Sequence, residues 1–423
     1  MKVKKTFSII SLGCFRNTYD SEILIHKLSR KGYVFSHSLT KAQKDDCVPS
    51  DSLIINTCGF IDKAKEESLD VIREAIEAKN NKKIKKVIVS GCLVKRYRKE
   101  LQKEFPGVDE WLSVEELNQA FTGKRKLTPS YFAFLKICEG CLNRCSFCAI
   151  PLIKGNLRSK PLDEIIKEAK YLDQKGIREL NIIGQDITSW GKDFSKSNNL
   201  TLLIKRLLKE TKNMKWIRLI YTHPRHLSDS LIELIANEER LCKYIDLPIQ
   251  HINDRILKLM NRQITKEEIT NLIYKIRKKI PGCAIRTSVI IGFPTETEDE
   301  FKELLQFVRE NKFDRLGAFT YSREEGTPAY NLSPQVHPSI KKRRFSELMS
   351  LQERVVLDLN KRFLNRELDV LVEENQTDVS VGRTQYDAYE VDGCVFIKRQ
   401  GLKIGSFYKV KITEAYGYDL IAG

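Results

Sequence analysis

Short apolar strands alternate with amphipathic helices over residues 7–120 and 131–336, and this alternation constrains the fold more than any other feature of the sequence. In the first region the expected strands are Phe7–Leu12, Leu53–Asn56 and Val87–Ser90. Strands that alternate with helices pair in parallel, because each helix carries the chain back across the sheet. The sequence therefore predicts an α/β protein that begins with a parallel-sheet domain.

The second region contains six strand–helix units, which fit an incomplete (β/α) barrel better than a flat sheet. A barrel of this kind places its chemistry at the carboxyl ends of its strands. A long polar helix is expected to follow, from about Ile340 to Leu364. The six expected strands are Tyr131–Ile137, Glu179–Ile183, Trp216–Tyr221, Tyr244–Leu247, Ala284–Ile291 and Arg315–Tyr321.

The last part of the chain changes character. The stretches ELDVLVEE, DVSVGRT, CVFIK and SFYKVKIT alternate in period two and are separated by Gly and Asp, which predicts a small antiparallel β-barrel or sandwich. We therefore expect three domains, over residues 5–122, 127–358 and 360–423.

Four cysteines lie in the stretch CEGCLNRCSFC, which comes directly after the first expected barrel strand. They are Cys138, Cys141, Cys145 and Cys148. Four thiolates can hold a structural zinc ion, but zinc ribbons separate their two thiol pairs by ten or more residues. Here only three residues separate the pairs, so a ribbon has no room for its strands. In the other interpretation, the last three cysteines hold an iron–sulfur cluster with one open iron.

Three further cysteines occupy equivalent positions in the first domain. Cys14 follows SIISLG, Cys58 follows LIINT, and Cys92 follows VIVSG. The carboxyl ends of parallel strands meet at one edge of the sheet, where ligand-binding crevices form. The pattern predicts that the three thiols converge on one metal site, again with an open position.

The spacing of Cys141, Cys145 and Cys148 resembles the signature of the radical S-adenosylmethionine (SAM) enzymes. The resemblance implies a [4Fe–4S] cluster whose open iron binds SAM, with Phe147 near the adenine. Other strand ends offer Gln185, Arg286 and Gly292 as SAM contacts. Arginine suits a carboxylate, and glycine permits close backbone approach. The segment GFPTET that begins at Gly292 is explained equally well as a turn and helix cap.

Nearly the whole chain resembles the methylthiotransferases of the radical SAM superfamily. The matching stretches are SLGCFRNTYDSE, INTCGFIDKAKEES, VSGC, CLNRCSFCAIP and GFPTETEDEF. The family combines an N-terminal domain that holds a second cluster, a radical SAM core and a C-terminal TRAM domain. Cys138 departs from the family pattern, which requires no cysteine there.

Two branches of this family differ in substrate. The stretches CAIPLIKGNLRSKP, DLPIQHINDRILKLMNR and GRTQYDAYEVDG resemble the RimO-like branch, which modifies an aspartate of a small-subunit ribosomal protein. The other branch modifies a purine of tRNA. Domains that bind RNA are expected to be basic, because contacts with phosphates dominate their affinity. Residues 361–423, however, contain nine Lys or Arg and ten Asp or Glu. This charge count favours the ribosomal-protein branch, and the tRNA enzyme is the alternative.

The resemblance implies two [4Fe–4S] clusters and SAM as cofactors, with Cys14, Cys58 and Cys92 holding the second cluster. A radical from SAM would remove hydrogen from the aspartate β-carbon, and the second cluster would present sulfur there. An electron donor and a sulfur donor are implied as partners. There is a physical reason for radical chemistry, because that C–H bond is too weakly acidic for a side-chain base.

The overall charge of +17 fits a nucleic-acid or ribosomal setting and fits equally a Lys-rich composition that keeps the protein in solution. The stretch Lys82–Lys99 carries eight Lys or Arg and no acid, and the basic excess of residues 1–360 leaves room for contact with ribosomal RNA beside the protein substrate. A non-enzymatic metal-ribbon protein that binds ribosomal RNA is the other class to exclude. The eleven cysteines fit a reducing cytoplasm, and no apolar run reaches the ~18 residues of a membrane helix. We expect a cytoplasmic monomer.

Overall fold

The first domain is built on a five-stranded parallel sheet. The computed structural model describes residues 5–39, 50–112, 123, 127–194 and 199–423, so the expected boundary at residue 122 lies outside the described residues. The elements of this domain are β1 (Thr6–Ser11), α1 (Phe15–Arg30), β2 (Val34–Leu39), β3 (Ser50–Thr57), α2 (Asp62–Asn80), β4 (Ile84–Gly91), α3 (Cys92–Glu104) and β5 (Glu110–Trp111).

The strand order is β2-β1-β3-β4-β5, which places the three strands expected from the sequence together at the centre. Ile54 of β3 pairs with Ile9 of β1 and with Ile88 of β4. Ile9 and Ile54 are buried, and helices cover both faces of the sheet. The two additional strands lie at the edges. The sequence did not reveal them, because β2 (VFSHSL) mixes polar and apolar residues without a clear alternation and β5 has two residues.

The central domain is an open arc of six parallel strands, which confirms the expected partial barrel. Two three-stranded sheets form it, in the orders β10-β9-β6 and β11-β12-β13, and a parallel bridge from Ile217 to Leu241 joins them. The strands are β6 (Phe132–Lys136), β9 (Glu179–Ile183), β10 (Trp216–Leu219), β11 (Tyr244–Asp246), β12 (Ala284–Ile291) and β13 (Arg315–Thr320).

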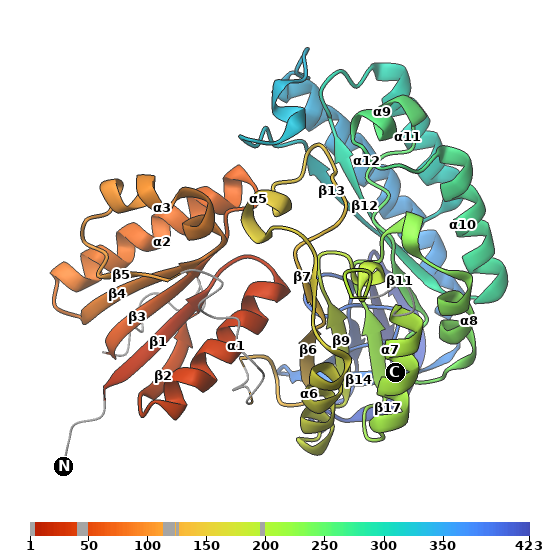
Figure 1. Ribbon diagram of the computed structural model, residues 1–423. Coiled ribbons are helices and arrows are strands. Elements are labelled where there is room, and N and C mark those ends of the chain that lie inside the picture. Colours follow the sequence, from red (N-terminus) through yellow and green to blue (C-terminus); the bar gives the residue numbers. More distant parts are fainter. Residues whose placement is uncertain (1–4, 40–49, 113–122, 124–126, 195–198) are drawn as a thin grey trace.

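Helices surround the outside of this arc (Figure 1), and their apolar faces form a large core against the strands. A short hairpin, a short helix and several 3-10 turns connect the larger elements. The helices and connecting elements are β7 (Cys138–Glu139), α5 (Ile150–Lys154), β8 (Arg158–Ser159), α6 (Leu162–Gln174), η2 (Ile187–Ser189), α7 (Leu200–Glu210), η3 (Pro224–His226), α8 (Asp229–Asn237), α9 (Asp254–Leu259), α10 (Lys266–Lys279), α11 (Glu298–Asn311), η4 (Pro328–Asn331), α12 (Pro338–Asn360) and η5 (Lys361–Phe363).

The C-terminal domain is a closed five-stranded barrel with the order β14-β15-β16-β18-β17. Four of its pairings are antiparallel, as expected, and β16 pairs with β18 in parallel. Buried Val and Ile residues fill its interior. The strands are β14 (Glu367–Asn375), β15 (Ser380–Arg383), β16 (Val395–Ile397), β17 (Phe407–Tyr416) and β18 (Asp419–Ala422).

The loop between β15 and β16 packs into the end of the central barrel where the strands begin. Arg383 bonds to Glu179, the first residue of β9, at 2.7 Å, and Arg218 of β10 shares the same carboxylate. Asp387 pairs with Arg315, the first residue of β13. All these charged side chains are buried. Because a buried charge is costly without a partner, these ion pairs hold the C-terminal barrel against the end of the central barrel where the strands begin.

Helix α1 covers the open edge of the central barrel at β6. Phe15 stacks on Phe134 with ring centroids 4.8 Å apart. Asp20 forms a buried ion pair with Lys136 of β6. The first domain is therefore docked on the barrel through both an aromatic contact and a buried charge pair, and its cysteine-bearing sheet edge faces the barrel.

Candidate active site

The three cysteines of the first domain lie at the same edge of the sheet. Cys14 is the N-cap of α1, Cys58 directly follows β3, and Cys92 is the first residue of α3. Cys58 and Cys92 are 7% exposed, and Cys14 is half-buried. The parallel register of β1, β3 and β4 brings their carboxyl ends together, as the sequence predicted.

One buried asparagine joins the loops that carry these thiols. The side-chain amide of Asn17 donates to the carbonyl oxygens of Leu12 at 2.8 Å and Thr57 at 3.0 Å. Its Oδ1 lies 3.7 Å from the Cys92 sulfur. Because a buried donor that loses its partner is costly, Asn17 fixes the ends of β1 and β3 relative to Cys92.

The loops also approach each other without room for further atoms. Gly13 has φ of +87°, and a Cβ there would lie 2.7 Å from the Cβ of Cys58 and 2.8 Å from its sulfur. Such a conformation favours glycine. The thiol of Cys58 is thereby held against the residue preceding Cys14, which places two of the three thiols in one small space.

The three thiols share one electrostatic environment. Burial raises the pKa of Cys92 to about 12, and the charges of Cys14 and Cys58 add to the shift. Burial also raises the pKa of Cys58, with a further contribution from Cys14. Burial acts in the same direction on Cys14, yet its pKa lies below the ordinary value because the Arg16 guanidinium stabilises the thiolate. Thiolates are the form that binds metals, so Cys14 is the most readily available ligand.

The second set of thiols lies on the loop after β7. The N–H of Cys141 donates to the Gly155 carbonyl oxygen at 3.3 Å, and the N–H of Cys148 donates to that of Cys145 at 3.1 Å. Between them, Ser146 bonds to the carbonyl oxygens of Leu259 and Met260 at the end of α9. The loop is therefore anchored at both ends and in its middle.

Cys138 is separate from this loop. It is 1% exposed and belongs to the apolar core of the barrel. Its sulfur lies 3.7 Å from the Asp186 carbonyl oxygen, and a Cβ on Gly184 would come within 2.6 Å of it. Burial holds the pKa of this thiol far above its ordinary value. This sulfur is packed into the barrel core, whereas Cys141 and Cys148 are only half-buried, which favours three cysteines at the site over four.

Phe147 belongs to this loop, and Arg262 lies beside it. Phe147 packs against the apolar cluster of Ile256, Phe293 and Tyr321, at the end of the barrel where β12 and β13 end. Arg262 directs its Nη1 to the Cys145 sulfur at 3.5 Å and its Nη2 to the Pro248 carbonyl oxygen. Arg262 is thus placed to interact with an anion bound at Cys145.

The two sets of thiols are neighbours. Cys92 forms a small buried cluster with Ala149 and Ile153, and Ala149 directly follows Cys148. Helix α5 lies between the first domain and the barrel and packs against α3 (Figure 1). The residue Cys92 of the first set and the residues that follow Cys148 in the second set are therefore in contact, although they are distant in sequence.

Arg16 lies between the two sets. Its Nη1 donates to the Gly184 carbonyl oxygen at 2.8 Å, and its guanidinium lies 4.4 Å from the centroid of the Tyr221 ring. Its positive charge favours the thiolate at Cys14, Cys58 and Cys148. This guanidinium therefore offsets negative charge from both sites.

A buried ion network supports the same region. Glu139 pairs with Lys136 at 2.5 Å and with Lys154 at 3.0 Å, and Asp20 contacts both lysines. Burial alone would raise the pKa of Glu139, but the two lysines hold it far below its ordinary value. Gln185, a predicted SAM contact, donates to Glu139 at 3.3 Å and so lies at this junction.

The other two predicted contacts are engaged elsewhere. Arg286 is ion-paired with Asp392 of the C-terminal domain, and Asp246 lies 3.9 Å from its Nε. Gly292 has φ of +67°, and a Cβ there would lie 2.4 Å from the Lys341 side chain. Its N–H donates to Glu296 at 2.8 Å. The structure thus supports the turn interpretation of Gly292, and Thr297 caps α11 as that interpretation expects.

The donor sets fit iron–sulfur clusters by their chemistry. Each set contains three thiols, near one cation or more, in loops with fixed backbones, and thiolates are the usual ligands of such clusters. Among the described residues, no three His, Cys, Asp or Glu side chains lie close enough to hold a single metal ion. Within the same residues, no helix is both long and apolar enough to cross a membrane.

Asn17, Arg16 and Arg262 were missed by sequence reasoning. Arg16 and Asn17 stand two and three residues after Cys14, in the first turn of α1, and this closeness to a predicted ligand is the signal that could have identified them. Arg262 lies 117 residues from Cys145, and only the fold brings the two together.

Comparison with protein families divides the chain into three matches. Residues 6–113 match the uncharacterized protein family UPF0004, residues 135–308 match the radical SAM superfamily, and residues 366–423 match the TRAM domain. The three matches correspond to the three domains of the fold.

Known relatives align with nearly the full chain. The ribosomal protein uS12 methylthiotransferase RimO of Citrifermentans bemidjiense is 43% identical, covering 99% of this chain and 98% of that protein. The RimO proteins of Chloroherpeton thalassium and Phocaeicola vulgatus are each 42% identical, covering 97% and 99% of this chain and 96% and 99% of theirs.

Solved structures agree on the fold. The radical SAM methyltransferase TsrM of Kitasatospora setae, with cobalamin and a [4Fe-4S] cluster bound, has a TM-score of 0.55 at 13% identity and covers 77% of each chain. The radical SAM enzyme OxsB has a TM-score of 0.51 at 11% identity, covering 83% of this chain and 56% of its own. The chain is a SAM-dependent radical enzyme, and it belongs to the RimO family of methylthiotransferases.

Proposed function

We propose that this protein adds a methylthio group to the β-carbon of an aspartate in ribosomal protein uS12. One [4Fe–4S] cluster would be held by Cys141, Cys145 and Cys148, and a second by Cys14, Cys58 and Cys92. The relatives that match along the whole chain are named for the modification of uS12. The observation that carries the proposal is the direct contact between the two thiol sets, where Cys92 packs against Ala149 and Ile153.

The clusters and SAM, when bound, would supply radical chemistry and sulfur, which side chains alone cannot provide. The protein would position these groups, offset their negative charge and exclude water from the space between them. Ala149 and Ile153 are 0% and 1% exposed and keep water from the space between the two sets. Arg16 offsets the negative charge of both sets from its fixed bond to the Gly184 carbonyl oxygen.

Three side chains are the best candidates to bind SAM. Phe147 offers an apolar surface for the adenine, and Gln185 offers an amide at the carboxyl end of β9. Arg262 offers a guanidinium beside Cys145 for the SAM carboxylate. Arg286 is left out of this set because its ion pairs join the barrel to the C-terminal domain.

The choice of a protein substrate rests on the relatives and on charge. Residues 361–423 carry no excess of positive charge, while nucleic-acid affinity depends on cations that contact phosphates. The TRAM match favours some contact with RNA. A small ribosomal subunit presents both uS12 and ribosomal RNA, so we expect the assembled subunit to be the substrate, with a separate electron donor and sulfur donor.

The test is a parallel modification assay. Anaerobically reconstituted protein is incubated with SAM, dithionite and sulfide, with small ribosomal subunits in one tube and tRNA in another. We expect mass spectrometry to find one added methylthio group on a uS12 peptide that contains aspartate. Methylthiolation of tRNA alone would overturn the proposal.

A matched thiol variant controls this assay. Cys283 is a buried thiol of the barrel core, so Cys283→Ala should retain iron and product. Cys145→Ala removes a proposed ligand and should lose iron and all SAM cleavage. Equal iron content in the two variants would contradict the assignment of Cys145.

A further inference from the structure

Arg16 is a half-buried cation that has no carboxylate partner in the part of the chain that the structure describes. Its polar partners there are the Gly184 carbonyl oxygen and the Cys14 thiol, and a guanidinium has five N–H donors. Glu139 also acts on its charge, but two lysines bind that carboxylate. Arg16 therefore has donors left for an anion. Three arginines of the barrel strands, by contrast, each pair with Asp or Glu; they are Arg218, Arg286 and Arg315.

Tyr221, directly after β10, supports this guanidinium with a ring that the fold holds in place. The Arg16 guanidinium lies 4.4 Å from the ring centroid. Tyr221 has φ of +68°, which is unfavourable for a bulky side chain. Its N–H donates to the Asp246 carboxylate at 3.0 Å, and its carbonyl oxygen accepts from the Ile187 N–H at 3.1 Å. Strained backbone of this kind is concentrated at functional sites, so the position of this ring requires an explanation beyond packing.

The hydroxyl group of Tyr221 adds a neutral donor beside the guanidinium. Burial raises the pKa of Tyr221, so the phenol keeps its proton at neutral pH. Asp246 already accepts from the Tyr221 N–H, and Arg286 is already ion-paired, which leaves Arg16 as the cation available to a ligand beside the phenol. The charged groups that act on the phenol come from both the first domain and the barrel; they are Arg16, Cys14, Asp246 and Arg286.

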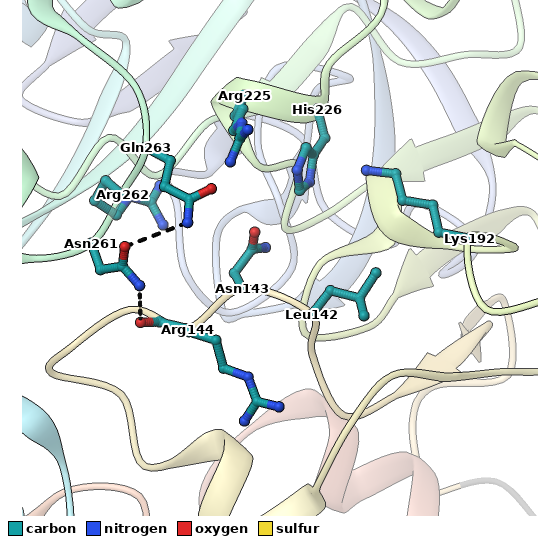
Figure 2. Close-up of a pocket in the computed structure, with 9 residues that line it drawn as sticks. All are labelled: Leu142, Asn143, Arg144, Lys192, Arg225, His226, Asn261, Arg262 and Gln263. Carbon is teal, nitrogen blue, oxygen red and sulfur yellow. Dashed lines mark hydrogen bonds between the residues drawn. The ribbon is translucent and has the colours of Figure 1, made fainter. Parts of the chain in front are cut away.

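Arg16 also borders both sets of thiols. Its charge favours the thiolate at Cys14 of the first set and at Cys148 of the second. Another group of cations lines a pocket of about 340 Å³ over the loop between Cys141 and Cys145 (Figure 2). No residue of the first domain lines that pocket. An anion bound there would therefore lack contact with the set to which we assign sulfur delivery.

The proposed reaction needs one carbon atom that both sets can reach, because hydrogen leaves it on the SAM side and sulfur arrives from the first domain. In an aspartate side chain, that β-carbon is bonded directly to the carboxyl carbon. A cation that borders both sets and binds the carboxylate would thus hold the reacting carbon between them. A purine base carries no carboxylate, so the same contact would not position it.

We propose that Arg16 and Tyr221 bind the carboxylate of the target aspartate and thereby select an acidic side chain as the substrate. The inference rests on the proposed function, and it names the substrate contacts of that reaction. A guanidinium and a carboxylate pair through two parallel hydrogen bonds, and the Tyr221 hydroxyl group donates a third. The strained backbone of Tyr221 keeps both donors in a fixed arrangement before the substrate arrives.

The first test is a double-mutant cycle on binding, without reductant. Small ribosomal subunits carry uS12 with the modified aspartate either retained or replaced by asparagine, and each is titrated into fluorescently labelled, reconstituted protein. We expect the wild type to bind the aspartate form roughly tenfold more tightly, and Arg16→Gln to bind both forms equally. Arg16→Lys should keep part of the preference. Arg225→Gln, which removes an exposed cation of the pocket in Figure 2, should keep all of it.

The second test follows deuterium from the aspartate β-carbon of labelled uS12 into 5′-deoxyadenosine, with SAM and dithionite. A misplaced β-carbon leaves SAM cleavage intact but gives 5′-deoxyadenosine without deuterium. We expect Arg16→Gln to transfer at most about a tenth of the wild-type deuterium for each 5′-deoxyadenosine formed. Tyr221→Phe, which keeps the ring and loses the hydroxyl group, should lie between the two. Cys58→Ala separates this role from a defect in the first thiol set, because it should transfer deuterium normally.

Three results would overturn the carboxylate site. One is an unchanged preference of Arg16→Gln for the aspartate form, and another is deuterium transfer by Arg16→Gln equal to that of Cys58→Ala. The third is loss of the preference in Arg225→Gln, which would move the anion to the pocket in Figure 2. Failure of the proposed function would appear separately, as wild-type protein that neither transfers deuterium nor forms methylthiolated uS12.

Discussion

Gly13 is the residue on which the geometry of the first thiol set depends most. Its φ is +87°, and a Cβ added there would lie 2.7 Å from the Cβ of Cys58, so the site has space for hydrogen only. We expect Gly13→Ala to lower the iron content by about half, since one of two clusters would be lost, while SAM cleavage persists.

Gly32 provides the matched control. It has φ of +91°, and nothing lies within 4 Å of an added Cβ. Gly32→Ala should therefore cost roughly 1–2 kcal/mol of unfolding free energy from backbone strain alone, with full iron content. If Gly13→Ala binds as much iron as Gly32→Ala, the contact with Cys58 is unimportant for the site.

Cys138 tests whether three or four cysteines of the second stretch bind iron. Its sulfur is packed against Gly184 and belongs to the barrel core. We expect Cys138→Ala to keep the wild-type iron content and rate of SAM cleavage, at a cost of about 1 kcal/mol in stability from the lost packing. Loss of iron on this substitution, measured by colorimetric assay, would restore the four-thiolate interpretation.

At the level of the elements, the strands that carry thiols were predictable from sequence. The central strands β1, β3 and β4 are apolar and buried, so their periodicity is clear. The edge strand β2 mixes polar and apolar residues without a clear alternation, and β5 is two residues long. Edge strands are held by pairing with a neighbour more than by burial, which a single sequence does not display.

The site residues that could be predicted are likewise those whose positions depend on nearby sequence. The cysteines were found because each follows a strand, and that relation is local. The role of Arg286 was not predictable, because its partner Asp392 lies 106 residues away in another domain. Arg262 was missed for the same reason, since its contact with Cys145 depends on the course of the chain around the barrel.

The contact between Glu179 of β9 and Arg383 at the end of β15 has a pH dependence that can be measured. Burial would raise the pKa of Glu179, but Arg383 and Arg218 hold it at about 2 instead of 4.5. Because the pKa of Glu179 is lower in the folded than in the unfolded protein, its ionised form stabilises the fold at every pH above 4.5. This contribution is lost as the pH falls from 4.5 to 2. It amounts to about 3 kcal/mol.

Trp216 of β10 can report on this contact, because its ring lies 4.7 Å from that of Phe407 in the C-terminal barrel. Urea unfolding followed by tryptophan fluorescence should show stability falling between pH 4.5 and 2. Glu179→Gln should be less stable at about pH 7 and lose less in that window. An identical slope for the two proteins would show that Glu179 does not carry the effect.

At the scale of the whole molecule, the first domain and the central barrel enclose the candidate site between them, and the C-terminal barrel lies at the other end of the central one. The first domain brings Cys14, Cys58 and Cys92 to its sheet edge, and the buried pair of Asp20 with Lys136 docks that edge on the barrel. The C-terminal barrel supports the opposite end through Arg383 and Glu179. We assign SAM cleavage to the barrel and sulfur delivery to the first domain.

This division of labour is the central claim, and Cys58→Ala tests it most directly. 5′-Deoxyadenosine and methylthiolated uS12 are quantified in the same anaerobic reaction with SAM, dithionite, sulfide and small ribosomal subunits, with Cys145→Ala as the variant expected to lose both products. We predict that Cys58→Ala still forms 5′-deoxyadenosine and forms no methylthiolated uS12. Undiminished methylthiolated uS12 from Cys58→Ala would contradict this division.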